Sequence, residues 1–168
     1  MDYMGPFNYR VDNLTVSKYW IFLITCLNTR AIFTKIVTSM TTKTLLHVIR
    51  RFVAVNGFPK WIVCDNAKVF KTLNEVQSNL FNPKVPEENV IDYCANRKIF
   101  FNFTASHSPW QGGVYERMVG IFKAAYKNAV GKELYDVETR KTLTAECTAI
   151  CNSRPLTYVT EEKSWYPL

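Results

Sequence analysis

Residues 19–37 have the sequence YWIFLITCLNTRAIFTKIV, and this stretch decides the fold class. β-Branched and aromatic residues dominate residues 19–27 and residues 30–37, a composition that is typical of strands. The two segments flank Asn28-Thr29, a pair that favours a tight turn, so the stretch predicts a β-hairpin. We therefore expect a sheet with a hairpin-built edge.

Helical and strand-like segments alternate after the hairpin. Thr41-Thr42 can cap a helix that runs to about Asn56, where Gly57 stops it. Residues 61–64 (WIVC) are few and wholly apolar, which is typical of a buried parallel strand. This order predicts a mixed α/β domain whose parallel strands are joined by helical crossovers. The other predicted elements are an extended segment at 3–9 interrupted by Gly5-Pro6, a surface excursion at 72–90, a short helix at 90–97, a strand at 99–103, and helices at about 111–130 and 135–152, the last closed by Pro155.

Composition and charge restrict the class of protein. With 168 residues, 48% of them apolar and 21% charged, the chain is large enough for one domain with a real core and is not a disordered sequence. Its net charge is +7, and the excess lies in residues 1–84, which hold eleven basic and four acidic side chains. This balance favours a polyanionic partner. No apolar run is long enough to span a membrane and no signal peptide is present, so no membrane partner is expected.

The five cysteines are odd in number and widely scattered, a usage that predicts a reduced intracellular protein. Cys147 and Cys151 lie four residues apart on a predicted helix and could share a metal ion. No second Cys/His pair has ligand spacing, and His47 and His107 are the only histidines. We therefore interpret Cys147 and Cys151 as core thiols.

Asp65 directly follows the predicted parallel strand at 61–64 and precedes Asn66. Sites in α/β sheets form beyond the carboxyl ends of parallel strands, so this carboxylate is a candidate site residue. The alternative interpretation is a turn or helix-capping aspartate.

The predicted helix at 111–130 has two distinct faces. Gly120, Lys123 and Lys127 fall within about 40° of Glu116 at 100° per residue. A glycine inside a helix costs about 1 kcal/mol relative to alanine, and close approach of a bulky partner to this face would explain it. The alternative is an ordinary solvated face with helix-supporting charge pairs. The residues predicted to form the opposite, apolar stripe are Val114, Met118, Phe122, Ala125 and Ala129.

Four segments, in this order, resemble the catalytic cores of retroviral-type integrases, and those of Pao/BEL-type retrotransposons in particular. The long interval between Asp65 and Glu116 suits the Pao/BEL branch, and the resemblance covers nearly all of the chain. The segments are Asp2-Tyr3-Met4-Gly5-Pro6-Phe7, Cys64-Asp65-Asn66-Ala67-Lys68-Val69-Phe70, Ser108-Pro109-Trp110-Gln111-Gly112-Gly113-Val114-Tyr115-Glu116-Arg117, and Asn152-Ser153-Arg154-Pro155-Leu156-Thr157-Tyr158.

The resemblance implies an RNase H-like fold, in which three antiparallel strands are followed by parallel strands and helices flank the mixed sheet. It also implies that Asp2, Asp65 and Glu116 are the three catalytic carboxylates (DDE) that bind two Mg²⁺ or Mn²⁺ ions. Such hard ions prefer carboxylate oxygens, and two of them about 4 Å apart can activate the attacking oxygen and stabilise the leaving oxygen. The implied activity is metal-dependent polynucleotidyl transfer in DNA integration, that is, 3′ end processing and strand transfer.

The resemblance further implies contacts with DNA. Lys123 and Lys127 would approach DNA phosphates, Asn66 would orient the substrate or a metal-bound water, and Gln111 would reach the DNA. His107 lies beside the third motif and is interpreted as a polar loop residue, with DNA contact as the alternative. Integrase cores usually pair, so a homo-oligomer is expected, and the function implies a nuclear location.

The chain departs from the family pattern at two places. Position 67 is alanine where the family usually has glycine, which predicts a slightly altered turn. Only one residue precedes Asp2, so we expect residues 1–168 to be a core domain lacking the start of its first strand, without the preceding zinc module or the following DNA-binding domain. The alternative to an active integrase core is a catalytically inactive remnant that binds nucleic acid or a protein partner. A nuclease of the wider RNase H-like group is disfavoured by the motif that ends at Glu116.

Overall fold

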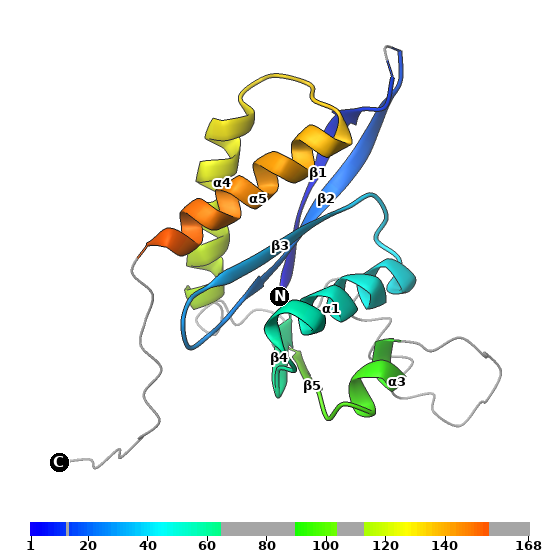
Figure 1. Ribbon diagram of the computed structural model, residues 1–168, viewed down its shortest axis with the longest axis vertical. Coiled ribbons are helices and arrows are strands. Elements are labelled where there is room, and N and C mark those ends of the chain that lie inside the picture. The colour runs from blue at the N-terminus through cyan, green and yellow to red at the C-terminus, as the bar shows by residue number, and fades with distance from the viewer. Residues whose placement is uncertain (13, 65–89, 104–112, 155–168) are drawn as a thin grey trace.

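A computed structural model describes residues 1–12, 14–64, 90–103 and 113–154, and its elements follow the predicted order (Figure 1). The surface excursion expected at 72–90 lies outside the described residues except for Val90, which begins a helix and is buried. The elements are β1 (Asp2–Arg10), β2 (Val16–Thr25), β3 (Ile32–Val37), α1 (Thr42–Asn56), β4 (Trp61–Cys64), α3 (Val90–Ala95), β5 (Phe100–Phe103), α4 (Gly113–Val130) and α5 (Val137–Ser153).

β1, β2 and β3 form an antiparallel sheet in that order, with Asp2 opposite Leu23 in the β1–β2 ladder. The predicted interruption in the first strand is confirmed, because the register shifts between Met4 and Phe7. Gly5 lies within this bulge with φ +137, and a Cβ there would lie 3.0 Å from Cδ1 of Trp20. Glycine therefore lets β1 bulge close against β2.

The hairpin between β2 and β3 is confirmed, and Asn28 and Thr29 lie in its turn, but the connection is longer than the two residues predicted. β2 ends at Thr25 and β3 begins at Ile32, so residues 26–31 form the connection. It is closed by the Cys26 amide, which donates to the Ala31 carbonyl at 2.8 Å, and Arg30 adopts φ 65. A two-residue type I′ turn needs positive φ at both central residues, whereas in this longer loop Arg30 is the residue at positive φ.

β4 and β5 form a parallel pair, with Trp61 opposite Phe100, and α3 belongs to the crossover between them. This confirms the predicted parallel strands with a helical crossover. The two sheets meet at the beginning of the chain, where the Met1 ammonium donates a hydrogen bond to the Val63 carbonyl. The start of β1 therefore lies between β2 and β4.

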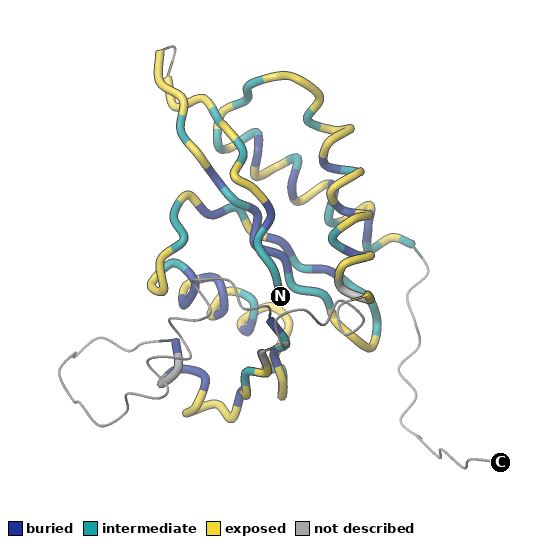
Figure 2. Tube along the Cα trace, turned by 180° about the vertical axis from the view of Figure 1, so that it is seen from behind, coloured by how far each residue is buried: buried dark blue, intermediate teal, exposed yellow. Residues whose placement is uncertain are grey.

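Helices cover both sides of the strands, as Figures 1 and 2 show. Alternate residues of β2 point to opposite sides, so Tyr19, Ile21 and Leu23 join the core under α4 and α5, whereas Phe22 joins the core under α1. The result is a three-layer arrangement in which α1 and α4 lie on opposite sides of the strands.

The cysteine prediction is borne out for the helix pair. Cys147 and Cys151 are buried in the core beneath α5, and burial raises the pKa of both thiols. All five cysteines are free, and only Cys26 is exposed. Along the described part of the chain, every helix is too short or too polar to cross a bilayer.

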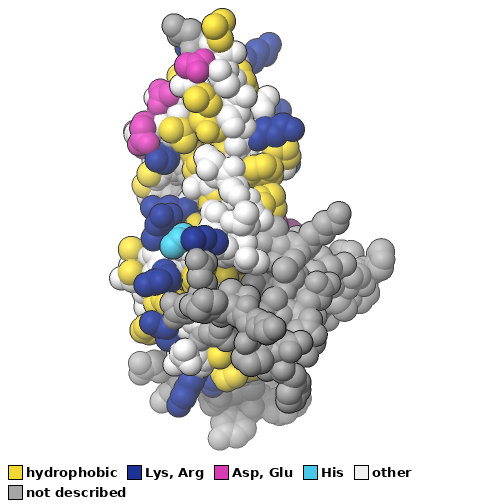
Figure 3. Space-filling view, turned by 90° about the vertical axis from the view of Figure 1, so that its right-hand side faces the viewer, with side chains coloured by type: hydrophobic (Ala, Val, Ile, Leu, Met, Phe, Trp, Pro, Cys, Tyr) yellow, Lys and Arg dark blue, Asp and Glu magenta, His cyan; other side chains and the backbone are white. Residues whose placement is uncertain are grey.

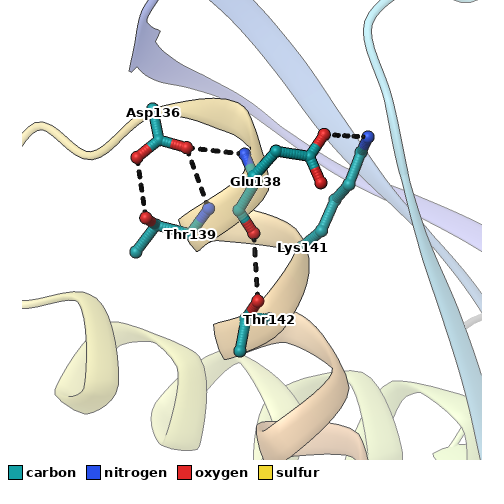
Figure 4. Close-up of polar contacts among 5 residues, drawn as sticks. All are labelled: Asp136, Glu138, Thr139, Lys141 and Thr142. Atoms are coloured by element: carbon teal, nitrogen blue, oxygen red, sulfur yellow. Dashed lines mark hydrogen bonds and ion pairs between the residues drawn. The ribbon is translucent and has the colours of Figure 1, made fainter.

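Polar contacts define the beginning of α5 (Figure 4). Asp136 is the N-cap, and its Oδ1 accepts hydrogen bonds from the amides of Glu138 and Thr139 at 2.8 and 3.0 Å. The Thr139 hydroxyl donates to the second carboxylate oxygen of Asp136 at 2.7 Å. Lys141 pairs with Glu138 at 2.6 Å in the same turn. These contacts satisfy helix donors that would otherwise lack a partner.

Candidate active site

Asp2 is the first residue of β1 and is half-buried. Its Oδ1 accepts a hydrogen bond from the Tyr3 amide at 2.7 Å, which holds the carboxylate in one orientation. Ladder pairing with Leu23 fixes the backbone at this position. The first predicted carboxylate is therefore carried by a strand of the sheet, as expected.

The carboxyl end of β4 lies close in space to the beginning of β1, where Asp2 is located. The hydrogen bond from the Met1 ammonium reaches Val63, the last residue but one of β4, and Met1 is the neighbour of Asp2. Cys64 ends β4 and is buried. Asp65, the second predicted carboxylate, follows Cys64 in the sequence but lies outside the described residues. The structure thus brings Asp2 close to the strand that leads into Asp65.

Glu116, the third predicted carboxylate, lies in the first turn of α4 and is exposed. A negative side chain is favourable at this end of a helix because the helix dipole is positive there. Met118 follows two residues later and belongs to the same buried cluster as Met4 of β1. Both residues lie two positions beyond a predicted carboxylate, so this cluster ties the beginning of α4 to the beginning of β1.

The outer face of α4 has the predicted composition. Gly120, Lys123 and Lys127 are exposed together with Glu116. A Cβ added at Gly120 would meet nothing within 4 Å, so nothing in the described part of the fold requires glycine there.

The predicted apolar stripe of α4 is correct in part. Met118 and Phe122 are buried and Ala125 is half-buried, but Ala129 is exposed and Tyr126 is buried instead. Tyr126 lies in this core, and its hydroxyl hydrogen-bonds the Tyr19 hydroxyl at 2.7 Å. The side chain of Val114 lies outside the described residues.

Several predicted residues lie outside the described part of the chain: Asn66 and Gln111 as DNA contacts, His107 as a loop residue, and Ala67 in the altered turn. Within the part that is described, no three His, Cys, Asp or Glu side chains cluster as metal ligands. The donor types that are described, two carboxylates at Asp2 and Glu116, are oxygen ligands of the kind that Mg²⁺ and Mn²⁺ prefer.

A clamp between α5 and β3 was not predicted from the sequence. The Asn152 side chain accepts from the Ile32 amide and donates to the Ile32 carbonyl, both at 2.8 Å. Arg154 donates to the carbonyls of Arg30 and Cys151, and its Nη2 lies 3.1 Å from Sδ of Met118. The only sequence signal was the segment beginning Asn152-Ser153-Arg154. Arg154 thereby connects the end of α5 to the turn of α4 that carries Glu116.

A cavity of about 590 Å³ in the described part of the fold does not include Asp2 or Glu116. It lies between the β2–β3 connection, the end of α1 and the start of β4, and it is lined mostly by apolar side chains, among them Ile24, Phe52 and Trp61. This cavity is therefore separate from the described carboxylates of the candidate active site.

Comparison with known proteins yields matches among solved structures alone. No protein-family model matches the chain, and no curated protein matches it. The magnesium complex of the HTLV-2 integrase catalytic core domain in its trimeric form has 13% identity and a TM-score of 0.55, over 87% of this chain and 80% of that chain. The dimeric form of the same core domain has 14% identity and a TM-score of 0.51, over 89% and 81%.

A chain in the simian T-cell lymphotropic virus intasome, solved in complex with PP2A regulatory subunit B56 gamma, has 13% identity and a TM-score of 0.58. That match covers 96% of this chain but 58% of the other, so the chain spans less than two thirds of this relative. Identities this low establish the fold alone. The antiparallel sheet of three strands and the parallel strand pair, flanked by helices, form the RNase H-like fold of retroviral integrase catalytic cores.

Proposed function

We propose that this chain is the metal-dependent polynucleotidyl transferase core of a retrotransposon integrase of the Pao/BEL type. The observation that carries the proposal is the contact between the beginning of β1 and β4, which brings Asp2 to the strand leading into Asp65. The HTLV-2 core was solved with magnesium, and the simian virus chain belongs to an intasome. Both relatives support divalent metal, DNA and a homo-oligomer as the partners, and DNA integration implies a nuclear site of action.

In this proposal the three carboxylates of Asp2, Asp65 and Glu116 hold two divalent ions. When bound, the ions would activate the attacking water or 3′ hydroxyl and stabilise the leaving oxygen. The Tyr3 amide orients the carboxylate of Asp2, and the strand ladder keeps it in place. Glu116 extends from the rigid first turn of α4, so the donors come from separate elements.

The lysines of α4 then position the substrate. Lys123 and Lys127 lie about two and about three turns beyond Glu116 on the same exposed face, about 10 and 16 Å along the axis at 1.5 Å per residue. Phosphates bound at both lysines would direct the DNA backbone along α4 toward the carboxylates. We assign Asn66 and Gln111 to supporting contacts with the substrate.

The test is strand transfer with Mn²⁺, measured on a labelled DNA end for the unaltered chain and for Asp2→Asn, Asp65→Asn and Glu116→Gln. We expect each variant to lose nearly all of the activity while its circular dichroism and Tm stay close to those of the unaltered chain. Lys141→Gln, on the exposed face of α5, is a control that should retain activity. Equal background product from all proteins would refute the enzyme proposal and favour an inactive remnant that binds nucleic acid or a protein.

A further inference from the structure

The exposed side of α1 is basic along most of its length. Lys43, His47 and Arg51 are spaced four residues apart, and Arg50 lies beside Arg51; all four are exposed. Residues four apart lie on one face of a helix, about 6 Å from each other along the axis. α1 contains no acidic residue, so the charged side chains that α1 itself places on this face are all basic.

The inner side of α1 packs against the hydrophobic core. Its buried residues are Leu45, Leu46, Val48, Ile49 and Val53. Thr41 caps the helix by accepting from the Thr44 amide, so the helix is anchored along its apolar face and at its beginning. The basic side chains therefore stand on a rigid support.

The same surface continues onto α3. The guanidinium of Arg50 lies 5.6 Å from the centre of the Tyr93 ring, and that of Arg97 lies 3.8 Å from it. Arg97 also donates to the Tyr93 carbonyl at 3.3 Å. Two cations are thus gathered around one aromatic ring at the α1–α3 junction. Figure 3 shows Lys, Arg and His side chains gathered on this side of the molecule, while the acidic side chains in that view lie at its other end.

This basic surface is separate from the lysines of α4. The core of α1 includes Phe22 of β2, whereas the core of α4 includes Tyr19, Ile21 and Leu23 from the opposite side of the same strand. The two helices lie on opposite sides of the strands (Figure 1). One straight DNA segment lying along Lys123 and Lys127 would leave the α1 surface uncovered.

We propose that the outer face of α1, continued by Arg97, is a second nucleic-acid surface that binds the phosphate backbone of a DNA segment other than the one on α4. Duplex DNA has one negative charge per about 1.7 Å of its axis, so side chains spaced about 6 Å apart can each meet a phosphate. An anionic membrane is the less suitable partner, because a helix that binds a membrane surface inserts its apolar face, and the apolar face of α1 is buried in the core. The proposal extends the proposed function without using its metal chemistry.

The experiment measures binding of a fluorescein-labelled duplex of about 30 base pairs by anisotropy, in EDTA, over about 0.05–0.3 M salt. The variant is the full chain with Lys43→Gln and Arg51→Gln. Loss of two phosphate contacts should reduce the salt slope by about 1.8 and weaken binding about tenfold or more near 0.1 M salt. Arg51→Lys, which keeps the charge, should bind like the unaltered chain.

The matched control is the double variant Lys132→Gln and Lys141→Gln, which removes the same net charge from exposed positions away from α1. A slope unchanged in the α1 variant, or reduced equally in this control, would overturn the proposal. Binding to phosphatidylserine vesicles that depends on Lys43 and Arg51, with an unchanged DNA slope, would also overturn it. A Tm close to that of the unaltered chain shows that the α1 variant is folded. Loss of DNA binding in Lys123→Gln/Lys127→Gln alone would support the proposed function and refute the second surface, so the two failures are distinguishable.

Discussion

The buried hydroxyl pair of Tyr19 and Tyr126 provides a quantitative test of what holds α4 against the strands. The two hydroxyls hydrogen-bond at 2.7 Å, and both residues are almost fully buried, with exposed fractions of 1% and 3%. Tyr126→Phe keeps the ring that stacks on Phe122 and removes only the hydroxyl. It leaves the Tyr19 hydroxyl buried without its partner.

A buried hydroxyl that loses its partner costs about 1–3 kcal/mol, so we expect Tyr126→Phe to lower the free energy of unfolding by about 2 kcal/mol. In a protein of this size, that change lowers Tm by about 4–8 °C. Tyr19→Phe should have a similar effect for the same reason. The double variant removes both hydroxyls together, leaves neither unpaired, and should cost less than about 1 kcal/mol.

The assay is urea unfolding followed by tryptophan fluorescence and circular dichroism for the four proteins of this double-mutant cycle. The coupling energy should be large, because the two single losses greatly exceed the loss in the double variant. If the two single losses simply add in the double variant, the hydroxyl pair does not position α4 and the reasoning is wrong. An unchanged denaturant slope shows that the comparison is between similar folded and unfolded states.

Four further predictions follow from the described contacts. Asn152→Ala removes both hydrogen bonds to Ile32 and should lower the free energy of unfolding, measured in urea, by about 2 kcal/mol. If the urea midpoint of Asn152→Ala or of Asn152→Gln matched that of the unaltered chain, these hydrogen bonds would not contribute to stability. Gly120→Ala should stabilise α4 by about 1 kcal/mol, because the new Cβ meets nothing within 4 Å, while weakening DNA binding in an anisotropy assay; unchanged binding would remove this face from the DNA contact. Hydrogen bonds from the Thr139 side chain and from backbone amides lower the pKa of Asp136, so the stability that Asp136 provides is present above about pH 4 and is lost as pH falls. Asp136→Ala should therefore lower Tm at neutral pH, and a Tm difference from the unaltered chain that persisted undiminished in acid would contradict this. Burial, followed by the hydrogen bond with Tyr126, raises the pKa of Tyr19, so the unfolded chain ionises first and stability should fall as pH rises above about 10; Tyr19→Phe should show a shallower loss, and an equal loss would contradict the assignment.

Local sequence patterns were sufficient to predict the order and type of the helices and strands, but not the residues at which each one begins and ends. β-Branched and aromatic content located β2 and β3, and the apolar run at Trp61–Cys64 located β4. The turn between β2 and β3 was located, but the connection is longer than predicted, and its end is contacted by Asn152 and Arg154 from the far end of the chain. Composition within a short window contains no information about such contacts.

In the candidate site, too, local features could be predicted from the sequence and long-range contacts could not. Helical periodicity placed Glu116, Lys123 and Lys127 on one exposed face, because the angle between successive residues is a local property of the helix. The burial of Tyr126 in place of Ala129 could not be predicted in this way, since it depends on a partner hydroxyl 107 residues away in the sequence.

By itself, the sequence determined the order of strands and helices, the carboxylate and lysine face of α4, and the excess of positive charge in the first half of the chain. Only the tertiary structure decided that the beginning of β1 contacts β4, that α4 buries Tyr126 and not Ala129, and that part of the positive charge forms a surface on α1 opposite α4. The physical reason is that periodicity and propensity act over a few residues, whereas these three features depend on pairing and packing between segments that are distant in the chain.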